Sequence, residues 1–211
     1  MNVITATVPM SHIKAALLFT EKKDKRDYLN GIMVEFGETE TVLVATDNTA
    51  LAAFRTGADP RGGAGFSRQS VTIPRDLCEA VAKMITGTVQ IVVAPGEHEQ
   101  RAVTLIGVDA GQSISGVATN GGYPFEWRRT MHATCDGTVA QYDLAMLARF
   151  EKAGKLLGRK YALIAHNGDK AGIVTFDRCD EFAGAIMPLR IVAAMACPAW
   201  VHGAPITEDA T

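Results

Sequence analysis

The sequence predicts an α+β fold built from a repeated β-α-β-β-β unit, with helices on one face and antiparallel sheets on the other. Runs of alternating apolar residues recur along the chain, helical patterns interrupt them at three places, and loops rich in Gly and Pro separate the units. The pattern is clearest in residues 26–55, where the special residues stand at strand ends. There Asp47 and Asn48 form a turn between two alternating runs, and both residue types tolerate the left-handed conformation that such turns need.

Each repeat is expected to contain one strand, one helix and then three strands. In the first repeat these elements are predicted at 3–8, 11–20, 29–36, 40–46 and 49–55, with Ser11 as the N-cap of the helix. In the second they are predicted at 70–73, 74–85, 89–93, 101–108 and 113–119, with Pro74 at the start of the helix. In the third they are predicted at 138–142, 143–157, 161–166, 172–176 and 182–187, with Asp143 as a cap and Gly158 as a stop.

This periodicity divides the chain into three parts. Residues 1–130 form a complete domain of two repeats, 1–57 and 68–130, joined by the Gly- and Pro-rich connector 58–67. Residues 131–190 form half a domain, and residues 191–211 form a tail outside the pattern.

Composition indicates a globular protein with a sizeable core, because 47% of the 211 residues are hydrophobic and 21% are charged. The longest apolar run, near 191–200, is too short to span a bilayer, and the first residues do not resemble a secretion signal. The four cysteines have no metal-ligand spacing, so we expect a reduced cytoplasmic protein with no metal and no cofactor.

Catalysis is not indicated by any motif. The five histidines are scattered along the chain. The glycine loop at 62–65 lacks the Lys-Ser/Thr of a phosphate-binding loop, and 111–116 lacks the spacing of a nucleophile elbow. We therefore expect a binding protein and not an enzyme.

Basic residues gather on the predicted helices although the net charge is −2. In the third helix an apolar stripe is opposed by a basic stripe. Taken alone, each helix could simply have a solvated face. If all three helices point the same way, they form a basic surface that contacts phosphates without reading bases. Twelve of the 21 Lys and Arg residues lie in the helices or directly after the first and third: positions 14, 22, 23, 25, 26, 75, 83, 149, 152, 155, 159 and 160.

Four short motifs in order resemble the bacterial-type sliding clamp, the beta subunit of DNA polymerase III. Residues 28–31 and 44–52 (Y-L-N-G and V-A-T-D-N-T-A-L-A) are similar to the family's Y-L-N-G and A-T-D-G-H-R-L-A. Residues 71–75 (V-T-I-P-R) are similar to the strand that leads into a helix in the second half of the same domain. Residues 123–129 (Y-P-F-E-W-R-R) resemble F-P-D-Y-R-R with one insertion, and residues 186–190 (I-M-P-L-R) resemble the terminal M-P-M-R-L.

The chain also departs from the family pattern. The family has three domains of two repeats each, whereas this sequence shows three repeats, equivalent to the middle domain and the last half of the third. The Gly, His and Arg that follow A-T-D in the family are here Asn48, Thr49 and Ala50, which puts the usual partner motifs in doubt.

The resemblance implies a DNA-clamp (processivity-factor) fold whose helices line a ring around double-stranded DNA. Tyr28 could equally be a packing residue. The residues expected to face DNA are Lys14, Lys22, Lys23, Lys25, Arg26, Tyr28, Lys83, Arg149, Lys152, Lys155 and Arg159.

The resemblance also implies an apolar pocket for a short peptide of a polymerase or another clamp-binding protein. The alternative is that its walls are ordinary core residues at strand ends. The residues expected to line the pocket are Leu29, Thr46, Leu51, Pro124, Met187, Pro188, Leu189 and Arg190.

A family ring uses twelve repeats, so three repeats per chain imply a homo-oligomer of four copies. In that ring the third repeats of two chains would pair to complete a domain. The competing hypothesis is a clamp-derived interaction or decoy protein that binds replication proteins and never encircles DNA.

Overall fold

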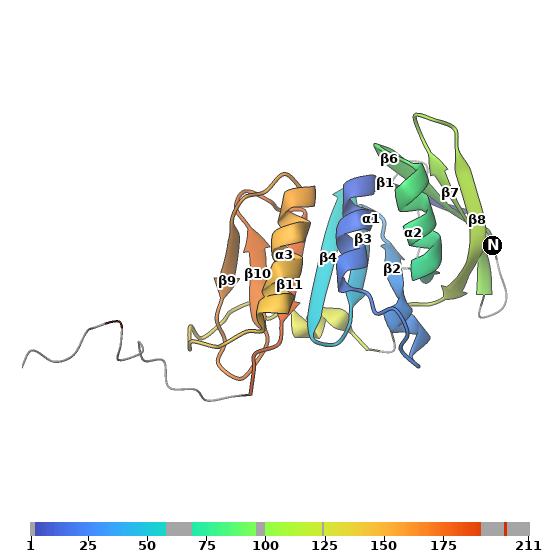
Figure 1. Cartoon of the computed structure of the whole chain (residues 1–211). Helices are drawn as coiled ribbons and strands as arrows, with labels where there is room; N and C mark the ends of the chain where they lie inside the picture. The colour runs from blue at the N-terminus through green and yellow to red at the C-terminus, as the bar shows by residue number, and fades with distance from the viewer. Residues whose placement is uncertain (1–2, 58–68, 96–99, 124, 191–200, 202–211) are drawn as a thin grey trace, which may run out of the picture.

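The computed structural model describes residues 3–57, 69–95, 100–123, 125–190 and 201. The described residues form one antiparallel sheet of eleven strands in the order β1-β6-β7-β8-β5-β2-β3-β4-β11-β10-β9. Figure 1 shows the three α-helices side by side on one face of this sheet, with α1 between α2 and α3. The expected separation of helices and sheet onto opposite faces is therefore confirmed.

The strands are β1 Ile4–Pro9, β2 Gly31–Phe36, β3 Glu40–Thr46, β4 Ala50–Gly57, β5 Gln69–Pro74, β6 Thr88–Val93, β7 Gln100–Gly107, β8 Ser113–Asn120, β9 Ala162–Ala165, β10 Gly172–Phe176 and β11 Phe182–Ile186. The α-helices are α1 Met10–Ala16, α2 Arg75–Met84 and α3 Leu144–Leu156. Three short 3₁₀ segments are η1 Leu17–Phe19, η2 Asp27–Asn30 and η3 Trp127–Thr130.

The first two repeats exchange their first strands. β1 of the first repeat pairs with β6 of the second, and β5 of the second pairs with β2 of the first. The third repeat joins this unit through its last strand, because β11 pairs antiparallel with β4 from Phe182 opposite Phe54 to Ile186 opposite Ala50. Repeats one and three therefore share a continuous sheet, although more than a hundred residues separate their strands in sequence.

Two details of the predicted elements are wrong. Ser11 does not cap α1, because the helix begins at Met10 with Pro9 at the N-cap position. Residues 138–142 were expected to form a strand but have no regular secondary structure. A strand needs a ladder of backbone hydrogen bonds to a neighbour. The segment makes only isolated contacts, such as Leu189 N–H to the Gln141 carbonyl at 2.8 Å and Gly168 N–H to the Thr138 carbonyl at 2.8 Å.

The main core lies between the helices and the sheet. Phe19 of η1, Phe54 of β4 and Phe150 of α3 are its largest fully buried side chains. The rings of Phe19 and Phe150 are 4.9 Å apart, so the first and third repeats share this core. Burial of such rings stabilises the junction between the two repeats.

A second apolar cluster covers the opposite face of β2, β3 and β4. Trp127 of η3 packs there against Met33, Val42 and Val44. Both faces of these strands are consequently buried, which explains why β2 is apolar at nearly every position and does not alternate. Tyr123, Trp127 and Met131 thus lie on the outer face of the sheet, away from the helices.

Candidate nucleic-acid interface and adjoining pocket

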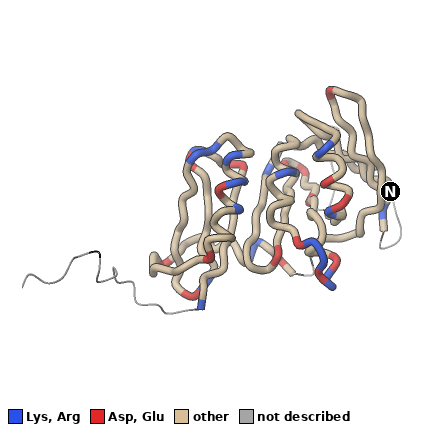
Figure 2. Tube along the Cα trace, viewed as in Figure 1, with Lys and Arg blue, Asp and Glu red and all other residues tan. Residues whose placement is uncertain are grey.

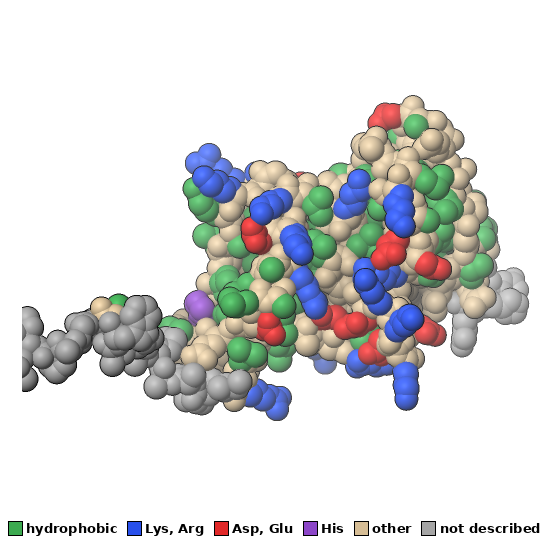
Figure 3. Space-filling view, in the orientation of Figure 1, with side chains coloured by type: hydrophobic (Ala, Val, Ile, Leu, Met, Phe, Trp, Pro, Cys, Tyr) green, Lys and Arg blue, Asp and Glu red, His purple; other side chains and the backbone are tan. Residues whose placement is uncertain are grey.

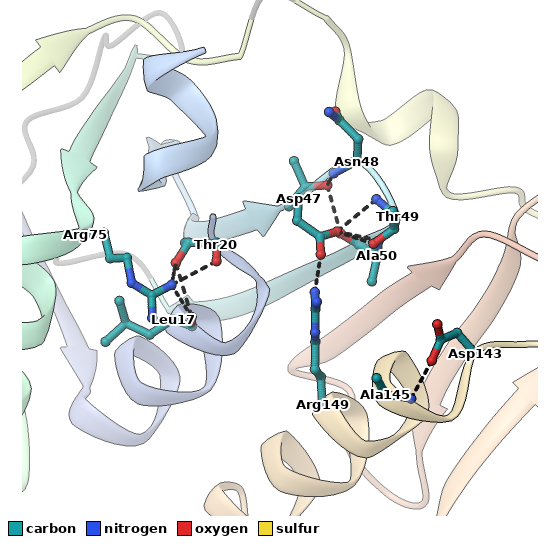
Figure 4. Close-up of polar contacts among 11 residues, drawn as sticks. Leu17, Thr20, Asp47, Asn48, Thr49, Ala50, Arg75, Asp143, Ala145 and Arg149 are labelled. Atoms are coloured by element: carbon teal, nitrogen blue, oxygen red, sulfur yellow. Dashed lines mark hydrogen bonds and ion pairs between the residues drawn. The ribbon is translucent and has the colours of Figure 1, made fainter. Parts of the chain in front are cut away.

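The third helix is fixed at both ends by the residues that the sequence indicated. The Asp143 carboxylate accepts a hydrogen bond from Ala145 N–H at 2.6 Å, as an N-cap does (Figure 4). Gly158 follows the helix with φ 68°, a conformation that favours glycine. Because Phe150 and Ala153 are buried, Lys152 and Lys155 point to solvent on the opposite side.

The helices of all three repeats carry lysines on the same side of the sheet. Lys14 of α1 is half-buried, whereas Lys83 of α2 and Lys152 and Lys155 of α3 are exposed. Figure 2 marks Lys and Arg positions along the helices, and Figure 3 shows their side chains distributed over the helix-bearing face with acidic side chains between them. One acid, Glu151, pairs with Lys155 at 2.6 Å. Such exposed pairs are weak, so both side chains remain available to other charges.

The loop between η1 and η2 extends this basic surface. Asn30 holds the loop closed, because its amide donates to the Asp24 carbonyl at 2.8 Å and its oxygen accepts from Asp24 N–H at 2.9 Å. Arg26 pairs with the Asp24 carboxylate through two bonds of 2.8 and 2.9 Å. The lysines at 22, 23 and 25 are all exposed. The loop is therefore held in one conformation by hydrogen bonds and presents three lysines to solvent.

Arg149 and Arg159 pair with acidic residues that lie outside the third helix. Arg149 donates to the Asp47 carboxylate across the junction between α3 and the β3–β4 turn (Figure 4). Arg159 lies 3.9 Å from Glu181, and its side chain is 33% exposed. Two residues of the predicted basic stripe thus have partners on other elements of the fold, a distinction that helical periodicity alone does not make.

The ring of Tyr28 lies among aromatic rings of the linker on the other side of the loop. Its centroid is 5.8 Å from that of Tyr123 and 6.2 Å from that of Phe125, both in edge-on geometry. Tyr123 in turn donates its hydroxyl to the Val44 carbonyl at 2.8 Å. The ring of Tyr28 therefore has packing contacts, and its role in DNA binding stays a prediction.

An apolar hollow of about 150 Å³ opens where the β3–β4 turn, the end of β11 and the linker meet. It contains three of the predicted pocket residues, Thr46, Leu51 and Met187. Pro124 lies outside the described residues. Leu29 of η2 is fully buried and does not line the hollow. Residues 188–190 follow Met187 and do not line it either. The other lining residues are Asn48, Thr49, Ala50, Phe125, Thr130 and Ala185.

The turn that forms one wall of this hollow is held by a buried carboxylate. Asp47 Oδ1 accepts hydrogen bonds from the Thr49 N–H at 2.8 Å, the Thr49 hydroxyl at 2.6 Å and the Ala50 N–H at 2.8 Å. Asn48 takes the left-handed conformation with φ 71°, as the turn chemistry predicts. Burial alone would raise the pKa of Asp47, but the bonds from Thr49, Arg149 and Ala50 outweigh it and lower the pKa.

Sequence reasoning missed Phe125 as a wall residue. Its ring stacks on that of Tyr123 with the centroids 5.3 Å apart and the planes 12° from parallel. A signal was present, because the aromatic residues Tyr123, Phe125 and Trp127 alternate in the linker. The contacts that orient them depend on the outer face of the sheet, which the linker sequence does not specify.

Among the described residues no group of His, Cys, Asp or Glu side chains is arranged to hold a metal ion. No helix in the described part of the chain has the length and apolar character needed to cross a membrane.

No protein-family model matches the sequence, and no curated protein matches it. Solved structures do match. The DNA polymerase sliding clamp from Pseudomonas aeruginosa is 15% identical with a TM-score of 0.69 over 89% of this chain and 66% of that chain. The sliding clamp from Bacillus subtilis is 11% identical with a TM-score of 0.67 over 89% of this chain and 64% of that chain. This chain has the fold of the bacterial DNA polymerase sliding clamp.

The beta subunit from the DNA polymerase of Streptococcus pyogenes is a further match, at 12% identity and a TM-score of 0.60 over 90% of this chain and 66% of that chain. The chain spans slightly less than two thirds of the length of these clamps. The low identity makes it a divergent version of the clamp fold, in agreement with the altered turn at Asn48–Ala50.

Proposed function

We propose that this chain is a sliding-clamp-like processivity factor that encircles duplex DNA without sequence specificity and tethers a polymerase or another replication protein. The observation that carries the proposal is the position of the three helices on one face of the sheet (Figure 1), together with the exposure of Lys83 in α2 and of Lys152 and Lys155 in α3. Lysines on long side chains bind phosphates through a sequence-independent, salt-dependent interaction. A face of this kind suits a protein that must move along DNA.

The similarity to solved sliding clamps supports the proposal, and so does the number of repeats in the chain. Three repeats per chain and twelve per ring require four copies, so we propose a ring of four chains with the helices toward the hole. The net charge of −2 agrees with a ring whose basic residues are concentrated on its inner side.

The test is retention on DNA of different topology. We expect the protein to stay on circular duplex DNA and to leave linear DNA through its free ends. Lys83→Glu, Lys152→Glu and Lys155→Glu together should reduce retention on circles by about tenfold or more. Arg129→Glu is the matched control, because Arg129 is exposed in η3, on the opposite face of the sheet. Equal retention on linear and circular DNA would contradict encirclement.

The hollow beside the β3–β4 turn is the proposed docking site for a partner peptide. Its walls combine the apolar Leu51, Phe125 and Met187 with the polar residues Thr46 and Thr49, a composition suited to an extended peptide with apolar anchors. Nine-residue peptides selected from a random library on the wild-type protein should lose at least about tenfold in affinity for Met187→Glu. They should bind Lys170→Glu normally, because Lys170 is exposed and does not line the hollow.

The competing proposal is an interaction protein with the clamp fold that does not encircle DNA. It predicts peptide binding at the hollow with no difference between linear and circular DNA, and no response to the three lysine substitutions. The two measurements together distinguish these functions.

A further inference from the structure

The complete domain shows how its two repeats depend on each other. β1 crosses to pair with β6 from Ile4 opposite Val93 to Pro9 opposite Thr88. β5 crosses to β2 in the same way, with Ile73 opposite Ile32 and Val71 opposite Val34. Each exchanged strand ends at the residue that precedes a helix, Pro9 before α1 and Pro74 before α2. The exchanged strands cover the edge of the other repeat and fill its core, since Ala6 and Val8 are fully buried.

The third repeat has the same parts without this exchange. Among the described residues β9 is the last strand of the sheet and pairs only with β10. The Tyr161 carbonyl accepts from Asp177 N–H at 3.4 Å on the β10 side. Because successive residues of an antiparallel strand direct their backbone groups to opposite sides, Ala162 and Ile164 direct theirs to the open edge. Such an edge is a template for another strand.

Apolar surface accompanies the open edge. Tyr161 and Leu163 are 59% and 54% exposed, and Leu144 at the start of α3 is 80% exposed. Between α3 and β9 an apolar hollow of about 150 Å³ is lined by Phe150, Ile164 and other side chains. In the first domain, the corresponding strands β6 and β2 have this edge paired with the exchanged strand of the other repeat.

The segment 138–142 lies where an exchanged strand would begin. It precedes the cap of α3, as β5 precedes α2. Leu189, just after β11, donates to the Gln141 carbonyl at 2.8 Å. This contact corresponds to the short pairing of β5 with β8, the last strand of its own repeat, at Thr72 opposite Thr119. One side of the segment is thus anchored in its own repeat, in the same way as β5.

We propose that two copies of this chain complete a domain by exchange, with residues 138–142 of each copy pairing antiparallel with β9 of the other. A second copy fits because it brings a strand-forming segment to an open edge twice, which gives a self-complementary two-fold interface. The proposal depends on the repeat geometry of the clamp fold and deepens the proposed ring, but it does not depend on DNA binding. The two copies would associate through backbone hydrogen bonds and apolar contacts alone.

The register follows from the first domain. Ile164 packs against the helix-side core as Val34 does, and Val71 of the exchanged strand lies opposite Val34. The equivalent pairs are Ala140 opposite Ile164 and Tyr142 opposite Ala162 of the second copy. Tyr142 already faces the main core, and its hydroxyl is buried without a hydrogen-bond partner. The bond from Ala140 N–H to His166 Nδ1 at 3.3 Å is replaced by the ladder.

The first experiment measures solution mass without DNA. At about 10 µM the wild-type chain should be a dimer or a multiple of it. Ala162→Pro removes an N–H group that only the second copy would use, and proline is tolerated on an edge strand. It should yield monomers with the circular-dichroism spectrum unchanged, whereas Ala162→Val should associate like the wild type. A monomeric wild type, or an Ala162→Pro protein that associates normally, overturns the proposal.

The second experiment tests the register. In a background without native cysteines, Gln141→Cys with Leu163→Cys should form a disulfide between copies under mild oxidation, because this pair would be non-hydrogen-bonded with Cα atoms about 4.5 Å apart. Gln141→Cys with Ala165→Cys is the matched control, displaced by two residues, and should cross-link less. Preferential cross-linking of the control overturns the register. Intact dimers that fail on circular DNA would count against the proposed function alone.

Discussion

Arg149 of α3 donates a hydrogen bond to the buried Asp47 carboxylate at the turn between β3 and β4. The Asp47 side chain is 3% exposed, and the two residues are 102 positions apart in sequence. The bond connects the helix of the third repeat to a wall of the candidate peptide pocket. It therefore links the docking of this repeat to the shape of the pocket.

Arg149→Ala should destabilise the protein, because it leaves the Asp47 carboxylate buried with one charged partner fewer. We expect a loss of about 1–3 kcal/mol in the free energy of unfolding, measured by urea denaturation. Lys152→Ala is the control, since Lys152 is exposed on the same helix, and should change stability by less than about 0.5 kcal/mol. Equal effects of the two substitutions would show that the ion pair contributes nothing.

Acid should weaken the fold through Asp47. Because hydrogen bonds from Thr49, Arg149 and Ala50 lower the pKa of this carboxyl in the folded state, the folded protein binds the proton less readily than the unfolded chain. The stabilisation is complete above the unfolded pKa of about 3.9 and is lost as pH falls through the lowered folded value. Melting temperatures from pH 7 to pH 2.5 should therefore fall less steeply for Asp47→Asn than for the wild type below about pH 4. Parallel curves would contradict this assignment.

The linker is fixed to the outer face of the sheet by Arg128 and Glu35. Arg128 donates to both Glu35 oxygens at 3.0 and 2.6 Å, and Trp127 Nε1 donates to the same carboxylate at 3.3 Å. Arg128→Ala should release the linker and cost about 1–3 kcal/mol of unfolding free energy. Limited proteolysis near residue 128 should accelerate, whereas Arg129→Ala, beside it but exposed, should leave the cleavage rate unchanged. Unchanged cleavage in both variants would argue against this anchor.

Local chemistry accounts for much of the fold that the sequence predicted. The cap at Asp143, the left-handed turn at Asn48 and the glycine stop at Gly158 each depend on neighbouring residues alone, so they were predictable. The start of α1 was misplaced because Ser11 is a common cap type. Pro9 provides the extended conformation before that helix without any side-chain bond.

The strand expected at 138–142 shows the limit of such reasoning. Its place before the third helix fits the first strand of a repeat, but a strand exists only beside a partner, and the described residues place none along its second edge. The candidate site was partly predictable for the same reason. Thr46, Leu51 and Met187 stand at strand ends, whereas the Arg149–Asp47 bond depends on how β11 meets β4. Helical periodicity therefore assigned Arg149 to the solvent-facing stripe and could not identify its partner.

Gly184 of β11 is a further test of the junction between the repeats. A Cβ atom at this position would lie 2.5 Å from Phe150 Cε1, and that ring is buried in the core shared by the first and third repeats. Gly184→Ala should therefore displace α3 from the sheet and lower the free energy of unfolding by about 1–3 kcal/mol. Near-ultraviolet circular dichroism should report the displaced ring, and denaturation should report the loss of stability. Gly57→Ala is the control, because a Cβ atom there would meet nothing within 4 Å. At this position β11 pairs with β4, with Gly184 opposite Ala52. If Gly184→Ala has the stability and circular-dichroism spectrum of the wild type, the contact between α3 and the sheet does not hold the third repeat in place.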